Sequence, residues 1–253
     1  MCNNKEIQSL LTSAGNNIFY CTKALDLPEV LIVNGMRHFR FCDFIYLPDY
    51  PENLSPDQVV TANTIRSHFY GILPQFNINS LIRRNFELFL SVWNPKRVLE
   101  IGPNTNPLLN SVCEGIKNIY MADLDRDALE NIKSLGLSCQ YFGMDSKLNL
   151  EDRSIDFIFA IFVFHFNFSE NQIFECNRVL SENGVFIANI YKRQSESKNK
   201  LLEIVKRCGF SITTIVDELN LCKGHEYWFL YKNYDENKIS KAREIIINQV
   251  NNQ

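Results

Sequence analysis

The feature that most constrains the fold is a regular alternation of short apolar runs with helix-length segments, which begins near Arg97 and ends near Tyr231. Such an alternation is typical of βαβ units, in which the strands form a parallel sheet and the helices cover its two faces. The run from Ile155 to Phe164 is almost continuously apolar, as expected for a strand that is buried on both faces. The pattern therefore predicts an open, doubly wound α/β fold.

Seven strands are predicted in this part of the chain, at residues 98–101, 119–122, 138–142, 155–164, 184–191, 210–216 and 226–231. The segments between them predict helices, one beginning at Pro107 and others spanning residues 127–135, 170–180 and 197–208. A polar loop joins the last two strands, so these two can pair antiparallel. We expect a seven-stranded, mostly parallel sheet with a C-terminal antiparallel hairpin.

The first 94 residues predict a separate extension that contains helices and a β-hairpin. Asn34-Gly35 lies between two strand-like runs, and this dipeptide favours the positive φ angles of a type I′ turn. Ser55-Pro56 predicts the start of one helix, and Asn94-Pro95 predicts the end of another. Three parts are therefore expected: an N-terminal extension at 1–94, the α/β domain at 95–232 and a helical tail at 233–253.

Composition and charge limit the classes of binding partner and the cellular locations that we expect. The net charge of −3 and the pI of about 5.9 argue against a dedicated nucleic-acid partner. No apolar run is long enough to span a membrane, and the N-terminus lacks the charged and apolar regions of a signal peptide. None of the eight cysteines forms a C-x-x-C pair, so no metal site is expected. We expect a cytoplasmic protein with free thiols and no membrane association, either a monomer or a homodimer.

In an open α/β sheet, ligands bind at the carboxyl ends of the strands. Gly102 directly follows the first predicted strand, where a glycine allows a tight turn and a close approach to a ligand. Asn106-Pro107 then predicts a helix start with free backbone N–H groups. The G-x-G-x-x-G pattern of pyrophosphate-binding loops is absent, and Glu100 would repel a phosphate but can help to position an ammonium group.

Aspartates follow the next two predicted strands. Asp123 can accept hydrogen bonds from both hydroxyls of a ribose, or it can cap the following helix, a role for which Asp125 competes. Asp145 can accept a hydrogen bond from an adenine amino group, or it can be an ordinary turn residue.

Together these features resemble the class I S-adenosylmethionine-dependent methyltransferases, a Rossmann-like family, over residues 97–232. The matching segments follow one another in the family's order: Glu100-Ile101-Gly102, Asp123, Asp145, Ser154 to Ala160, and Asn177 to Ile187. The resemblance implies S-adenosyl-L-methionine as the cofactor. It also implies a cofactor site formed by Glu100, Gly102, Pro103, Asn104, Asn106, Asp123, Leu124, Asp145, Ser146, Ala160 and Ile161.

The loop after the first strand departs from the family's glycine-x-glycine-x-glycine pattern, because Asn104 and Asn106 replace the later glycines. Asparagine tolerates a positive φ better than other residues with a side chain, so the loop can keep its shape. The two side chains would then crowd the methionine end of the cofactor.

The resemblance implies that a methyl group passes by in-line displacement to an oxygen or nitrogen atom of a small-molecule acceptor. His165 lies where many members that act on small molecules carry a histidine, and it can serve as a general base. Alternatively, its ring packs among the neighbouring phenylalanines. Tyr191 and Tyr70 are further catalytic candidates, as is His68. An RNA or protein methyltransferase and a non-catalytic cofactor-binding module are the alternative functions.

The N-terminal extension is rich in aromatic residues: Phe19, Tyr20, Phe39, Phe41, Phe44, Tyr46, Tyr50, Phe69, Tyr70 and Phe76. A mostly apolar lid over the strand ends would suit a small, partly hydrophobic acceptor. Simple packing of these rings within the extension is the alternative interpretation.

Overall fold

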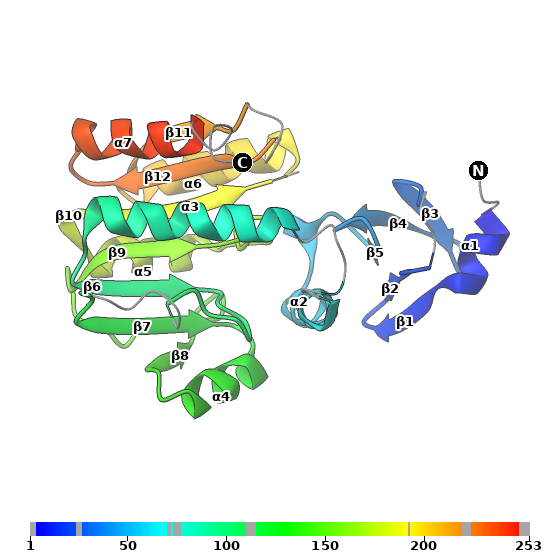
Figure 1. Cartoon of the computed structure of the whole chain (residues 1–253). Helices are drawn as coiled ribbons and strands as arrows, with labels where there is room; N and C mark the ends of the chain where they lie inside the picture. The colour runs from blue at the N-terminus through cyan, green and yellow to red at the C-terminus, as the bar shows by residue number, and fades with distance from the viewer. Residues whose placement is uncertain are drawn as a thin grey trace. The chain divides into compact units, whose positions relative to one another are not determined.

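The computed structural model describes residues 4–23, 27–69, 72, 77–109, 115–191, 193–218 and 224–247. The chain forms two compact units, Met1–Asn77 and Ile78–Gln253 (Figure 1), and each is described by itself.

The first unit is built around an antiparallel sheet in the order β1-β2-β5-β4-β3. Its elements are α1 (Asn4–Leu10), β1 (Thr12–Gly15), β2 (Ile18–Tyr20), β3 (Val30–Val33), β4 (Met36–Phe41), β5 (Ile45–Leu47), the 3-10 turn η1 (Pro51–Asn53) and α2 (Pro56–Phe69). The predicted hairpin is confirmed as β3 and β4. Asn34 and Gly35 take φ angles of 52° and 77°, as the type I′ turn requires. The other three strands of this sheet were not predicted, because their short segments carry no clear alternation.

The second unit contains a seven-stranded sheet in the order β11-β12-β10-β9-β6-β7-β8. Its strands are β6 (Arg97–Ile101), β7 (Asn118–Asp123), β8 (Cys139–Tyr141), β9 (Ile155–Ala160), β10 (Leu180–Ile190), β11 (Ser211–Val216) and β12 (Glu226–Tyr231). All pairings are parallel except those of β12, which runs antiparallel to both β10 and β11. The predicted fold class is therefore confirmed. The chain winds outward through β7 and β8 and then returns to β9 beside β6, which places the topological switch point between β6 and β9.

Helices cover both faces of this sheet. Their bounds are α3 (Asn77–Trp93), α4 (Arg126–Ser134), α5 (Glu170–Val179), α6 (Ser195–Arg207) and α7 (Glu236–Ile247). One core cluster joins the sheet to α5 and α6 through residues such as Ile173 and Leu201. The other joins it to α3, α4 and α7 through residues such as Phe86, Leu129 and Ile239.

Helix α3 belongs to the second unit, so the units divide after Asn77, whereas the sequence predicted a boundary after residue 94. The rings of Phe86 and Phe89 pack on the sheet, with ring centroids 5.8 Å from Phe159 and 5.4 Å from Phe229. Because α3 buries its apolar face on the seven-stranded sheet, it belongs to the second unit and not to the first.

Two strand bounds also differ from the prediction. The strand predicted to reach Phe164 ends at Ala160, because Phe162 takes a φ of +60°, which extended backbone does not allow. Strand β10 begins at Leu180, four residues early, with an irregular register between Leu180 and Val185. Most of the helix predicted from Pro107 lies outside the described residues. Among the helices that the structure describes, none is long and apolar enough to cross a membrane.

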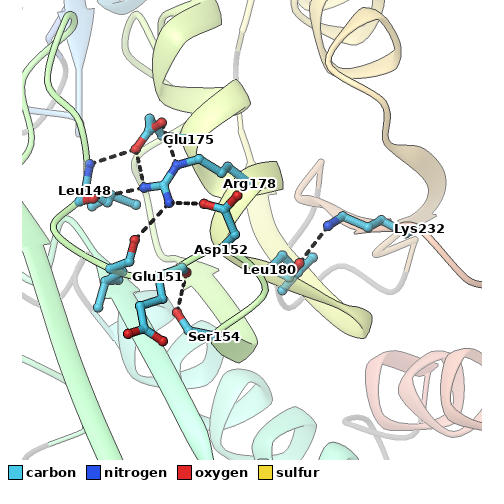
Figure 2. A network of polar contacts seen from close by, with 9 residues as sticks. Leu148, Glu151, Asp152, Ser154, Glu175, Arg178, Leu180 and Lys232 are labelled. Carbon is cyan, nitrogen blue, oxygen red and sulfur yellow. Dashed lines mark hydrogen bonds and ion pairs between the residues drawn. The ribbon is translucent and has the colours of Figure 1, made fainter.

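The Arg178 side chain, on α5, forms hydrogen bonds with the segment that connects β8 to β9 (Figure 2). Its guanidinium donates to both oxygens of Glu175, at 2.9 and 2.7 Å. It also donates to the carbonyl oxygens of Leu148 and Leu150, at 2.9 and 2.8 Å, and to Asp152. Glu175 in turn accepts the Leu148 N–H at 2.8 Å. The Arg178 side chain thus completes a hydrogen-bond network that holds a segment without helix or strand.

We expect Arg178→Ala to lower the free energy of unfolding by about 2–3 kcal/mol, because it leaves Glu175 and two carbonyl groups without their donor. The Arg178 and Glu175 side chains are only 15% and 9% exposed, so water cannot fully replace the lost bonds. Urea unfolding measures the change. Arg207→Ala, which removes an exposed pair with Glu170, is the matched control and should have little effect. Equal effects of the two variants would contradict the assigned role.

Candidate functional site

The strand register brings four residues into one row across β7, β6, β9 and β10: Ala122, Ile101, Ala160 and Ala188. The residue that follows each of them therefore lies at the same edge of the sheet: Asp123, Gly102, Ile161 and Asn189. This edge carries the carboxyl ends of the parallel strands and includes the switch point, where ligands of open α/β sheets bind.

Gly102 fits its position for two separate reasons. Its φ of +68° is in the left-handed region that favours glycine. A Cβ built on it would overlap Cγ2 of Val163, which belongs to the segment after β9. Because glycine has no side chain, the backbone at Gly102 can lie directly against Val163, in the segment that follows β9.

Glu100 holds the far end of the loop that Gly102 opens. Its side chain is buried, and its two carboxylate oxygens accept the backbone N–H groups of Leu108 and Leu109, at 2.9 and 3.1 Å. Burial raises the pKa of this carboxyl to about 7, while the two backbone hydrogen bonds lower it. Both oxygens accept N–H groups of the chain's own backbone, so Glu100 anchors the loop, and its help in positioning an ammonium group stays a prediction.

Asp123 holds the near end of the same loop. One of its oxygens accepts the Asn104 N–H at 2.9 Å, and the other accepts the Asp125 N–H at 3.0 Å. Burial raises the pKa of Asp123 to about 6. The N-cap of α4 is Asp125, which accepts from Asp127 and Ala128, so the cap role does not fall to Asp123. A carboxylate has about four acceptor positions, which leaves capacity for hydroxyl groups.

The two asparagines of the loop differ in their roles. Asn104 takes a φ of +51°, and its side-chain oxygen accepts the Thr105 N–H at 2.6 Å. It therefore replaces a glycine without losing the left-handed backbone. Asn106 is exposed, and its N–H donates to the carbonyl of the buried Pro103 at 3.3 Å. The loop keeps a tight form despite the missing glycines.

Asp145 and Ser146 lie in the turn after β8. Ser146 closes the turn, because its hydroxyl accepts the Gly143 N–H at 3.0 Å and its own N–H donates to the Gly143 carbonyl. Asp145 is exposed and accepts from the side-chain amide of Asn171 at 3.2 Å. A contact between Asp145 and adenine stays a prediction. The half-buried Leu124 contributes a backbone N–H beside Asp123.

A second group of polar side chains lies at the ends of β9 and β10. His165 is 4% exposed, and its Nδ1 accepts the backbone N–H of Tyr191 at 3.2 Å. The Tyr191 ring stacks on His225, with ring centroids 4.2 Å apart and an interplanar angle of 6°. The structure therefore brings together two of the predicted catalytic residues, His165 and Tyr191, and adds a third side chain to them.

Sequence reasoning missed His225 and Asn189. Asn189 is fully buried; its side-chain oxygen accepts the Phe162 N–H at 2.7 Å, and its amide nitrogen lies 3.5 Å from Nδ1 of His225. Burial lowers the pKa of His225 to about 4. His225 precedes β12, and because β12 is antiparallel, its start lies at the edge where the parallel strands end. The predicted hairpin could have revealed this position.

The remaining catalytic candidates are elsewhere. Tyr70 lies outside the described residues. His68 is exposed on α2 of the first unit, where its ring contacts Phe69 at a centroid distance of 4.8 Å. Within the described part of the chain, no group of three or more histidine, cysteine, aspartate or glutamate side chains is placed to hold a metal ion.

Gly102→Ala should destabilise the protein more than Gly136→Ala. Both glycines have a positive φ, of 68° and 76°, so each alanine costs about 1–2 kcal/mol in backbone strain. Only the new Cβ at position 102 would meet another atom, that of Val163, and overpacking adds about 1–3 kcal/mol. Denaturant unfolding of both variants gives the comparison. Adding Val163→Ala to Gly102→Ala should recover part of the loss, and a lack of recovery would contradict the steric explanation.

Glu100 should make stability depend on pH in a defined direction. Because burial raises its folded-state pKa, its contribution is fully present below the ordinary pKa of 4.5 and is lost as the pH rises to about 7. Relative to Glu100→Gln, the unchanged protein should therefore lose about 3 kcal/mol of unfolding free energy across this window. Urea titrations at a series of pH values measure the difference. Glu130→Gln, at an exposed pair with Lys133, is the control and should leave the pH profile unchanged. A difference that does not vary with pH would disprove the prediction.

Comparisons with known proteins agree with this geometry. Residues 99–188 match the family model described as a methyltransferase domain. No curated protein sequence matches the chain. Among solved structures, a S-adenosylmethionine-dependent methyltransferase from Clostridium acetobutylicum is similar over 68% of this chain and 100% of that one, with 12% identity and a TM-score of 0.51.

Two further structures share the fold at the same TM-score of 0.51. A candidate S-adenosyl-L-methionine-dependent methyltransferase from Methanococcus maripaludis is 14% identical over 73% of this chain and 98% of its own. The CMeT domain of citrinin polyketide synthase is 15% identical over 72% of this chain and 58% of its own. The matched family model and the shared fold lead to one conclusion: residues 99–188 form a methyltransferase domain of the S-adenosylmethionine-dependent kind, and the protein is an enzyme with S-adenosylmethionine as methyl donor.

Proposed function

We propose that this enzyme transfers the methyl group to an oxygen or nitrogen atom of a small-molecule acceptor. One observation carries the proposal: the polar side chains at the ends of β9 and β10 are buried among aromatic rings. His165, Asn189 and His225 are 4%, 0% and 1% exposed. The rings of Phe162 and Tyr191 lie against these imidazoles. Buried polar groups with an aromatic surround suit a compact acceptor better than the surface of a polymer.

The residues at the strand edge fit S-adenosylmethionine as the donor. Gly102 supplies the close backbone approach, and Asp123 supplies an acidic side chain at the end of β7 with acceptor capacity for ribose hydroxyls. Asp123 and Asn189 are three strands apart, which at about 4.8 Å per strand is about 14 Å. An extended cofactor along this edge would carry its methyl group toward the His165 end.

The sulfonium supplies a reactive methyl group when the donor is bound, so the chain's own residues mainly bind and orient the two reactants. The loop from Gly102 to Leu109, held at both ends by carboxylates, would position the donor. The aromatic side chains after β9 would exclude water from the acceptor. His165 and Tyr191 would contact the acceptor, and Tyr70 is retained as a further candidate.

We assign the choice of acceptor to the first unit, as a substrate-recognition extension of the common sheet. Several of its aromatic rings serve internal packing. Tyr46 is fully buried, and Phe69 contacts Tyr20 and Phe44 within the same unit. The half-buried rings of Phe39 and Tyr50 stack on each other at 4.3 Å. The free cysteines, such as Cys21 and Cys176, support a cytoplasmic location.

Labelled methyl transfer into a cell extract tests the acceptor class. The full chain is incubated with S-adenosylmethionine carrying an isotopically labelled methyl group, and the extract is then separated into small molecules, RNA and protein. We expect label in the small-molecule fraction. Asp123→Ala should reduce it by about 10- to 100-fold through weaker donor binding, because hydrogen bonds to a charged group contribute about 1.5–3 kcal/mol each. Label in RNA or protein, or label in no fraction, would overturn the proposal.

A further inference from the structure

The hydrogen bonds at Asn189 determine which way its amide faces. The Phe162 N–H can only donate, so the Asn189 atom 2.7 Å away must be the amide oxygen. The amide nitrogen therefore faces His225, 3.5 Å from Nδ1. An amide nitrogen can only donate, so Nδ1 of His225 must carry the lone pair. The hydrogen of a neutral His225 is then on Nε2.

Burial also keeps His225 neutral. The ring is 1% exposed, and desolvation lowers its pKa to about 4. Among the charged groups nearby, the buried Asp217 donates its backbone N–H to the His225 carbonyl, and Glu226, next in sequence, is paired with Lys198. Tyr191 covers one face of the ring. At neutral pH the imidazole is thus fixed in one tautomer.

His165 is held in the same tautomer by a different donor. The backbone N–H of Tyr191 donates to its Nδ1 at 3.2 Å, so Nδ1 carries the lone pair and the hydrogen of the neutral ring is on Nε2. The Arg193 guanidinium donates to the carbonyl oxygens of Phe164 and Phe166, on either side of His165 in the chain, at 2.9 and 2.8 Å.

A general base needs a lone pair that faces the proton it removes. In both histidines the ring nitrogen with the lone pair is occupied by a donor of the protein itself. From this we infer that His165 and His225 are positioning residues held as neutral Nε2–H tautomers, and that the acceptor is a small, weakly basic amine, neutral at pH 7, whose nitrogen reacts without prior loss of a proton. This inference rests on the proposed function and narrows it to transfer onto nitrogen.

The reaction balances without a base on the enzyme. The lone pair of the neutral amine forms the new nitrogen–carbon bond as the carbon–sulfur bond breaks. The electron pair of the broken bond goes to sulfur, which changes from a sulfonium to a neutral thioether. The positive charge passes to the methylated nitrogen, which then loses a proton to water. A hydroxyl acceptor would instead need a group to take its proton during the transfer.

The tautomers can be measured directly by long-range proton–nitrogen NMR of the full chain with ¹⁵N-labelled histidine, in the presence of S-adenosylhomocysteine. Only four histidines are present, so His38→Gln and His68→Gln, both in the first unit, leave the signals of His165 and His225. We expect hydrogen on Nε2 of both rings at neutral pH. A hydrogen on Nδ1 of either ring would overturn the inference.

Asn189→Asp tests the positioning role of the amide. A carboxylate can only accept, so it should move the hydrogen of His225 to Nδ1 or leave the ring charged, a spectroscopic change that a merely space-filling residue would not cause. An unchanged His225 spectrum would argue against the assigned hydrogen bond.

Product chemistry separates this inference from the proposed function. In the labelled extract, a ¹³C-methyl group on nitrogen is distinguished from one on oxygen by its carbon chemical shift. Label as N-methyl in the small-molecule fraction supports both statements. Label as O-methyl in the same fraction overturns the amine inference and leaves the proposed function intact, whereas label in RNA or protein overturns the proposed function.

Discussion

Two buried carboxylates hold the loop after β6, and the candidate site depends on them. Glu100 receives the backbone N–H groups at the far end of the loop, and Asp123 receives the Asn104 N–H near its start. Burying a carboxylate costs free energy, which is why the pKa values of both groups are raised. The backbone donors offset part of that cost. The same groups thus fix the loop and make it sensitive to protonation.

The other half of the site is joined to this loop by packing. Val163 lies against Gly102, so the segment after β9 cannot shift without disturbing the loop after β6. Asn189 then links the same segment to His225 through Phe162. A continuous set of contacts therefore runs along the strand edge from the loop to the two histidines. The hydrogen bonds of Arg178 hold the segment that leads into β9 and so stabilise the start of this strand.

Much of the second unit could be predicted, because strands that are buried on both faces leave strong apolar runs. The seven-stranded, mostly parallel sheet, the antiparallel hairpin and the left-handed Asn104 all agree with the expectations from the sequence. The extent of the first unit's sheet could not be predicted, because strands such as β2 (Ile18–Tyr20) have only three residues. The sequence could not assign α3 to the correct unit. Its amphipathic pattern shows that one face of the helix is buried, but it does not show against which sheet.

The sequence by itself determined the fold class and the donor, and it predicted the edge of the sheet at which the candidate site lies. These follow from periodicity and from residues that stand directly after strands, which are local properties of the chain. Only the tertiary structure decided what those residues do. Glu100 became a loop anchor, and His165 acquired a fixed tautomer from the Tyr191 backbone. His225 joined them from a distant segment. Hydrogen-bond direction and burial depend on groups far apart in sequence, so they exist only once the chain has folded.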